Sequence, residues 1–145
     1  MIDSFDKEYA FLSNFYPCVV ECSQGIIYPT VEHAFQASKT MDMDDRLIIA
    51  DTATPGQAKR MGRKVQLVDN WNLVRIRVME RLLRQKFKQE RFSSSLKLTK
   101  GHELIEGNHW NDTFWGVCRG KGKNNLGKLL MAIRDDLLFP DRTVH

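Results

Sequence analysis

The chain has 145 residues, of which 42% are hydrophobic and 28% charged, with a formal net charge of +4 and an isoelectric point near 9.1. This length fits one domain with a substantial core, no apolar run approaches the roughly 18 residues of a membrane span, and the acidic N-terminus lacks the apolar segment of a signal peptide. We therefore expect a cytoplasmic globular protein whose mildly basic charge favours anionic partners such as nucleotides, phosphates or nucleic acid.

The N-terminal part of the chain predicts a small β element followed by short helices. The β-branched pair Val19 and Val20 and the apolar run 26–28 flank a loop that contains Gly25, which is typical of a hairpin within residues 11–30. Thr30 is placed to cap a helix that ends near residue 40. Further helices are expected at 43–52 and 55–66, and a Thr–Pro pair opens the second of these.

The C-terminal half is expected to be mostly helical. The longest predicted helix covers 71–92, a short helix follows at 93–101, and residues 102–108 are a candidate for a brief strand. The last predicted helix runs from Asn124 or Asn125 to about Leu138, with a regular apolar stripe. These elements predict a mainly α (α+β) fold, a single helical domain over 1–145 with a small N-terminal β-hairpin.

Three polar residues share one side of the predicted helix at 30–40. At 100° per residue, Glu32, Gln36 and Lys39 lie within roughly 60° of one another on the helix surface. A carboxylate, an amide and an ammonium in one file can line a cleft, although the same pattern is typical of a solvated helix face. His33 lies off this file, and we interpret it as a packing or capping histidine.

The stretch "RGKGKNN" directly precedes the last predicted helix. Gly120 and Gly122 alternate with Lys121 and Lys123, and Asn124 stands at the predicted helix start. Free backbone N–H groups at a helix N-terminus, glycine flexibility and two lysines would together form an anion-binding nest. A flexible, solvated basic turn is the alternative interpretation.

Other polar and aromatic residues carry weaker indications. In "GNHWNDTFWG", Asp112 is a candidate second carboxylate or an Asx-turn residue, and Trp115 could stack on a base or anchor the core. Cys118 could be a nucleophile with His109 as its base, or an inert thiol. The basic residues of the long helix could bind nucleic acid or simply be solvated: Arg75, Arg77, Arg81, Arg84, Lys86 and Lys88.

The cysteines give no indication of a disulfide framework or a metal site. The chain has three, and an odd, sparse count fits a reducing compartment. Cys18 and Cys22 are spaced C-x3-C with no second pair nearby, which makes a zinc site improbable. We expect neither a metal nor another cofactor.

Several segments together resemble the NADAR family, also called YbiA-like. In order and spacing these are "FLSNFYP", "YPTVEHAFQASKT", "AKRMGRKV", "NWNLVRIRVMERLLRQKF", "LIEGNHWNDTFWG" and "GKGKNNLGKLLMAIRDDL", from about Phe11 to Leu138. The family is known for N-glycosidases. Some members cleave the ribosyl–amine bond of phosphorylated intermediates of riboflavin synthesis, and others remove ADP-ribose from guanine, including guanine in DNA.

The resemblance implies a helical fold without a metal and assigns roles to particular residues. Glu32 is the expected main catalytic residue, Asp112 and Trp115 match the family's "D-x-x-W-G" stretch, and Asn14 and Phe15 are expected beside the pocket. Gln36, Lys39 and the segment 120–124 (Gly120, Lys121, Gly122, Lys123 and Asn124) are the remaining expected substrate-binding residues.

The expected reaction is hydrolysis of a C1′–N ribosyl bond in a phosphorylated riboside. The substrate is either a small ribosylamine phosphate or ADP-ribosylated guanine, free or in nucleic acid. In this scheme Glu32 stabilises the oxocarbenium-like sugar and activates water, while Asp112 is a weaker candidate for protonating the base. A non-catalytic sensor of ADP-ribose or a related nucleotide is the alternative.

Overall fold

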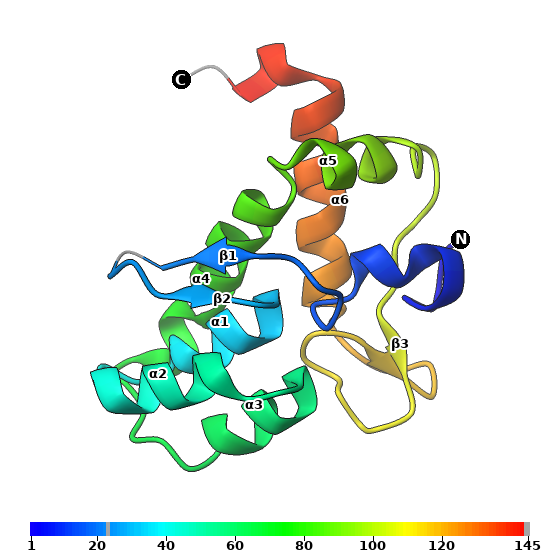
Figure 1. Ribbon diagram of the computed structural model, residues 1–145. Helices are drawn as coiled ribbons and strands as arrows, with labels where there is room; N and C mark the ends of the chain where they lie inside the picture. The colour runs from blue at the N-terminus through cyan, green and yellow to red at the C-terminus, as the bar shows by residue number, and fades with distance from the viewer. Residues whose placement is uncertain (23, 144–145) are drawn as a thin grey trace. The chain divides into compact units, whose positions relative to one another are not determined.

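The computed structural model describes residues 1–22 and 24–143, which fall into two compact units. One unit comprises Asn14–Lys86, and the other comprises Met1–Ser13 together with Phe87–His145. Figure 1 shows helices dominating both units, and the described residues also form two small two-stranded sheets. The prediction of a mainly α fold with a small N-terminal β-hairpin is confirmed.

The unit Asn14–Lys86 is built around the helix α1 (Val31–Ala37), in which every residue is buried. The hairpin of β1 (Val20–Glu21) and β2 (Ile27–Tyr28) packs on α1 from one side, as do α2 (Met43–Asp51) and α3 (Pro55–Gly62) from another (Figure 1). The helix α4 (Trp71–Lys86) also contacts α1. A short helix can be stable when it is enclosed in this way, because tertiary burial replaces the intrinsic stability that its length does not provide.

Local signals in the sequence set most helix starts in this unit. Thr30 Oγ1 accepts a hydrogen bond from His33 N (3.1 Å), which caps α1. Thr54 caps α3 through Gln57 N, and Pro55 follows as the first helical residue. Both caps agree with the prediction, because a hydroxyl oxygen satisfies a backbone N–H that the first turn leaves unpaired.

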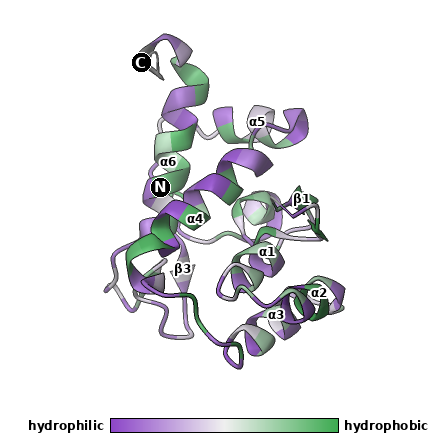
Figure 2. Cartoon of the chain, turned by 90° about the vertical axis from the view of Figure 1, so that its left-hand side faces the viewer, coloured by the Kyte–Doolittle hydropathy of each residue, from purple (hydrophilic) through white to green (hydrophobic). Residues whose placement is uncertain are grey.

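In the other unit the helix α6 (Asn125–Leu138) packs against α5 (Glu90–Lys97). Figure 2 shows apolar and polar stretches alternating along α6, and the apolar side buries Leu126, Leu130 and Ile133. Residues Gly107–Asn108 (β3) pair in parallel with Val117–Cys118 (β4). Two 3-10 helices, Lys7–Leu12 (η1) and Pro140–Thr143 (η2), complete the unit.

The predicted long helix at 71–92 and the short helix at 93–101 have the wrong boundaries. The helix ends at Lys86 and a new helix begins at Glu90, so that α4 and α5 are separate helices. Phe87 and Phe92 are both buried, with ring centroids 6.2 Å apart. Residues five apart on a continuous helix point about 140° away from each other, so the break allows both rings to enter one core.

Candidate active site

The predicted site residues are divided between the two units. In Asn14–Lys86 the central residue is Glu32, which is only 8% exposed. Its backbone N–H donates to the carbonyl oxygen of Asn14 (3.1 Å), which places Asn14 next to the first turn of α1. The interpretation of Glu32 as part of a solvated face is therefore wrong.

Gln36 holds one oxygen of the Glu32 carboxylate. Its Nε2 donates to Glu32 Oε2 at 3.4 Å, one helical turn along α1, and Gln36 is itself 4% exposed. Its Oε1 is buried without a hydrogen-bond partner. A buried amide oxygen that accepts nothing is costly, so an acceptor in this position is well suited to a hydroxyl or N–H of a ligand.

Lys39 lies in the electrostatic field of both Glu32 and several cations. Burial lowers the pKa of Lys39, the charge of Glu32 raises it, and Arg63, Lys59 and Arg75 lower it. The opposite charge of Glu32 therefore favours the protonated form of Lys39. The structure therefore joins Gln36 to Glu32, as the spacing along the helix predicted, whereas the place of Lys39 in the site stays a prediction.

Asn14 adds a second buried acceptor near this group. Its Oδ1 is buried and has no hydrogen-bond partner, while its Nδ2 lies 3.5 Å from Met79 Sδ. Phe15 follows with 44% of its surface exposed. The carbonyl contact to Glu32 supports the expectation that Asn14 lines the site, and the role of Phe15 stays a prediction.

His33 is a structural residue, in agreement with the prediction. Its Nδ1 lies 2.7 Å from Thr30 Oγ1 and its Nε2 lies 3.1 Å from the carbonyl oxygen of Thr52. Because a carbonyl can only accept, Nε2 carries the proton and Nδ1 accepts from the hydroxyl. Burial lowers the pKa of His33, and the hydrogen bond to Thr52 partly offsets this effect.

One residue of this region was missed by the sequence analysis. A β-carbon at Gly62 on α3 would overlap Oε1 of Gln36, so the glycine makes room for the amide that holds Glu32. The available signal was a glycine inside an otherwise helix-favouring stretch, "AKRMGRKV", which often marks a close approach.

In the other unit, Asp112 organises the loop that it belongs to. Its Oδ1 accepts from Phe114 N (3.1 Å) and Trp115 N (2.9 Å), which is the geometry of an Asx turn. The Asp112 backbone is in turn held by the side chain of Asn108. Trp115 is half-buried, and its ring meets Phe114 edge-on at 4.8 Å.

The segment 119–124 is a structured turn rather than an open nest. Arg119 and Gly120 have φ values of 52° and 76°, and Cys118 and Lys121 exchange both backbone hydrogen bonds across them. These are the features of a type I′ hairpin turn. The side chains of Lys121 and Lys123 are exposed.

The expected free N–H groups at the start of α6 are already used. Carbonyl oxygens of the preceding loop accept from the backbone N–H groups of the first residues, in the pairs Lys123–Thr113, Asn124–Gly116, Asn125–Phe114 and Leu126–Trp115. The side chain of Asn124 is also hydrogen-bonded to the backbone, because Oδ1 accepts from Glu106 N and Nδ2 donates to Leu104 O. An anion here would therefore be bound by lysine side chains and not by these amides.

The remaining candidates do not form sites in the described residues. Cys118 Sγ lies 3.8 Å from Asn111 Oδ1, and the His109 ring packs edge-on against Trp110. Lys86, expected on a basic surface, is fully buried. Within residues 1–22 and 24–143 no cluster of His, Cys, Asp or Glu could hold a metal ion, and no helix there is long and apolar enough to cross a membrane.

Comparisons with known proteins agree with the resemblance seen in the sequence. The chain is 39% identical over 139 residues to the N-glycosidase YbiA of Escherichia coli (strain K12), an alignment that covers 92% of this chain and 85% of that protein. It is 37% identical over 138 residues to a riboflavin biosynthesis protein of Vibrio vulnificus (strain YJ016), covering 91% of this chain but only 36% of that longer protein.

A solved structure and a family model extend the agreement to the fold. The NMR structure of E. coli YbiA matches with a TM-score of 0.83 and 37% identity, covering 100% of this chain and 91% of that one. The model of the NADAR domain matches residues 2–138, which is nearly the whole chain. The chain belongs to the NADAR family.

Proposed function

We propose that the chain is an N-glycosidase that hydrolyses the C1′–N bond of a phosphorylated riboside, with Glu32 as the catalytic carboxylate. The observation that carries the proposal is the arrangement on α1, where a buried carboxylate is held by Gln36 through one oxygen. The charge of this carboxylate also raises the pKa of Lys39, which follows the helix. The names of relatives as N-glycosidases support the same class of hydrolase. Removing a carboxylate from water costs free energy, so a buried carboxylate is typical of a functional group rather than of a surface charge.

The chemistry of the bond accounts for the residues present. As the C1′–N bond breaks, its electron pair goes to the base nitrogen and positive charge develops on C1′ and the ring oxygen. The Glu32 carboxylate stabilises this charge and takes a proton from the water that attacks C1′. The unpartnered oxygens of Gln36 and Asn14 accept hydrogen bonds from sugar hydroxyls, and Lys39 holds the carboxylate or the sugar.

Residues of the other unit have proposed roles that rest on their family motif. Asp112 protonates the departing base or orients its edge, and Trp115 stacks on that base. Lys121 and Lys123 bind substrate phosphate through their exposed ammonium groups. The Asx turn supports a positioning role for Asp112, because one of its carboxylate oxygens is committed to the loop.

Two substrate classes fit the proposed reaction. The name of the relative in V. vulnificus refers to riboflavin biosynthesis, which favours a ribosylamine phosphate of that pathway. ADP-ribosylated guanine, free or in nucleic acid, presents the same type of bond. The first relative is nearly three times longer than the segment matched here, so the activity of that whole protein comes to this chain only as a proposal.

A non-catalytic sensor of ADP-ribose is the alternative from another class. It requires tight binding without turnover, and it gives no reason to keep a carboxylate buried beside Gln36. The Glu32→Gln variant separates the two functions, with Glu80→Gln as the matched control because Glu80 only forms a surface pair with Arg84. We expect Glu32→Gln to lower kcat by at least about 100-fold with little change in KM, and Glu80→Gln to leave both unchanged. Near-normal turnover of Glu32→Gln would contradict the proposal.

A further inference from the structure

The exposed side of α2 carries several large apolar side chains. Met41 and Met43 stand at the start of the helix, Leu47 and Ile48 follow one turn later, and their exposed fractions range from 43% to 69%. Apolar residues that are scattered singly are normal on a protein surface, whereas these four lie within a span of eight residues. A patch of this kind is typical of a surface that another molecule covers.

The charges beside these apolar side chains are negative. Asp44, Leu47, Ile48 and Asp51 are spaced i, i+3, i+4 and i+7, so they share one side of α2 within roughly 100°. All four are exposed. The helix therefore presents an apolar pair with a carboxylate at each end, and these carboxylates disfavour an anionic membrane or a nucleic acid as the occupant.

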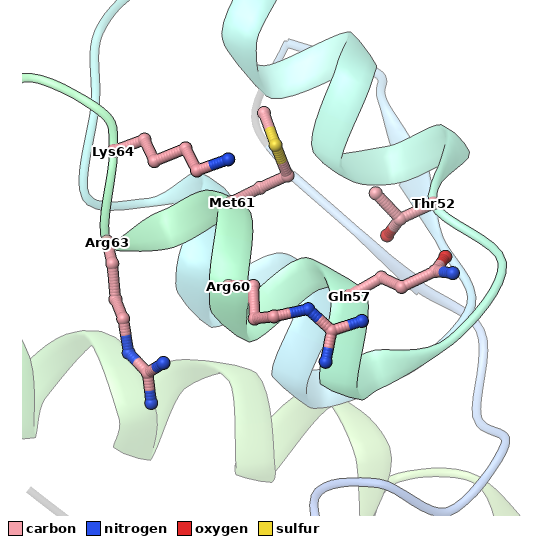
Figure 3. A pocket seen from close by; sticks show the side chains of 6 residues that line it. All are labelled: Thr52, Gln57, Arg60, Met61, Arg63 and Lys64. Carbon is pink, nitrogen blue, oxygen red and sulfur yellow. The ribbon is translucent and has the colours of Figure 1, made fainter.

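The neighbouring helix α3 borders an apolar hollow. This cavity of about 480 Å³ is lined by Thr52, Gln57, Arg60, Met61, Arg63 and Lys64 (Figure 3). Its wall is almost entirely apolar. The Thr52 hydroxyl and Gln57 Oε1 are already hydrogen-bonded to backbone groups (2.8 and 2.9 Å), and in Figure 3 the Arg63 guanidinium points away from both residues. The hollow therefore suits an aliphatic side chain better than a polar group.

The charges of the two helices are opposite. Residues 55–64 contain four cations and no acid, whereas residues 42–51 contain four aspartates and one cation, Arg46, which is buried. Within the part of the chain that the structure describes, no salt bridge joins these two sets, since the one found there pairs Arg84 with Glu80. Because α2 and α3 pack against each other, one surface combines a negative and a positive half, each beside apolar groups.

We propose that this surface of α2 and α3 is the interface between two copies of this chain. In a dimer with two-fold symmetry both copies use the same surface, so α2 of each copy faces α3 of its partner. The pair Leu47 and Ile48 packs over the partner's apolar hollow, and the aspartates of α2 face the basic residues that border it. Charge complementarity selects this arrangement, because α2 against α2 or α3 against α3 would oppose like charges. The inference is independent of the proposed hydrolysis.

The test is the mass of the protein in solution, measured by sedimentation equilibrium over a wide range of protein concentrations. The mass should rise from 16.9 kDa toward twice that value with concentration, and the dissociation constant should increase with salt. Two charge reversals, Asp44→Lys/Asp51→Lys on α2 and Arg60→Glu/Lys64→Glu on α3, should each raise the dissociation constant by at least about tenfold. Arg77→Glu/Arg81→Glu on the exposed side of α4 is the matched control and should change it less than about twofold.

Mixing the two reversed variants tests the arrangement itself and also guards against misfolding. Each variant alone opposes like charges across the interface. In the mixture the reversed α2 of one variant meets the reversed α3 of the other, and the second contact keeps its natural charges. We therefore expect the equimolar mixture to regain the dimer, with a dissociation constant close to that of the unaltered protein. A mass of 16.9 kDa at every concentration, a mixture that stays monomeric, or equal weakening by the α4 control would overturn the proposal.

Discussion

Gln36 on α1 occupies the space that a side chain at Gly62 on α3 would need. The amide oxygen that lies over Gly62 is the buried, unpartnered Oε1, and the nitrogen of the same amide donates to Glu32. The absence of a side chain on one helix thus determines how a carboxylate is held on another. This relationship is open to a direct test.

Replacing Gly62 with alanine should displace Gln36 and thereby release Glu32. We expect the free energy of unfolding to fall by about 1–3 kcal/mol, as for other overpacked sites, and kcat to fall as well. Gly56→Ala is the control, since a β-carbon there meets nothing closer than 3.9 Å. That variant should be neutral or slightly stabilising, because alanine favours the helix. Equal effects of the two substitutions in chemical denaturation would contradict the packing argument.

The effect of the Glu32 charge on Lys39 predicts a change in the Lys39 pKa when Glu32 is replaced. The Glu32 charge raises the pKa of Lys39 against the effect of burial, so Glu32→Gln should lower the Lys39 pKa further below its already depressed value. The Lys39 pKa is measured by NMR titration of the Lys39 side chain, with Glu80→Gln as the control. A Lys39 pKa that is the same in both variants would show that the two groups are not close.

The buried His33 predicts how stability depends on pH. Its pKa in the folded state lies below the ordinary 6.5, so the unfolded state binds the proton more readily. The stabilisation is complete above about pH 6.5 and is lost as the pH falls through the folded-state pKa. Urea denaturation should therefore show a lower free energy of unfolding at pH 5.5 than at pH 7.5. In His33→Gln this difference between the two pH values should be smaller, although the variant is less stable at pH 7.5. An unchanged difference in His33→Gln would assign it to other groups.

Asp112 can be tested by two substitutions that affect different properties. Asp112→Asn keeps an oxygen for the N–H groups of Phe114 and Trp115, whereas Asp112→Ala removes it. If the loop is all that Asp112 supports, the asparagine variant should keep its activity and the alanine variant should lose about 1–2 kcal/mol of stability. If Asp112 also delivers a proton, as proposed, the asparagine variant should fold normally and turn over slowly, which stopped-flow or product assays would detect.

Elements with local signals could be predicted from the sequence. The caps at Thr30 and Thr54 fixed the starts of α1 and α3 within one residue, since a cap is formed by neighbours in the chain. The contact between Glu32 and Gln36 followed from helical spacing alone. These features depend on residues no more than one or two turns apart.

Features that depend on distant partners could not be predicted. The carbonyl groups that cap α6 come from residues 113–116, about ten residues earlier, so the pattern of glycine and lysine gave no indication that its amides are used. Lys86 belongs to a basic run yet is fully buried, because tertiary packing and not local charge decides its position. The close approach of Gly62 to Gln36 likewise joins residues 26 positions apart.

The most direct test of the central claim is a product assay on two substrates side by side, each with the unaltered protein and with Glu32→Gln. One is a ribosylamine phosphate of the riboflavin pathway, and the other is an oligonucleotide that carries ADP-ribosylated guanine. We predict that the unaltered protein releases the base from at least one of them and that Glu32→Gln does so at least about 100-fold more slowly. If neither is cleaved while ADP-ribose binds, the protein is a sensor and the catalytic account is wrong.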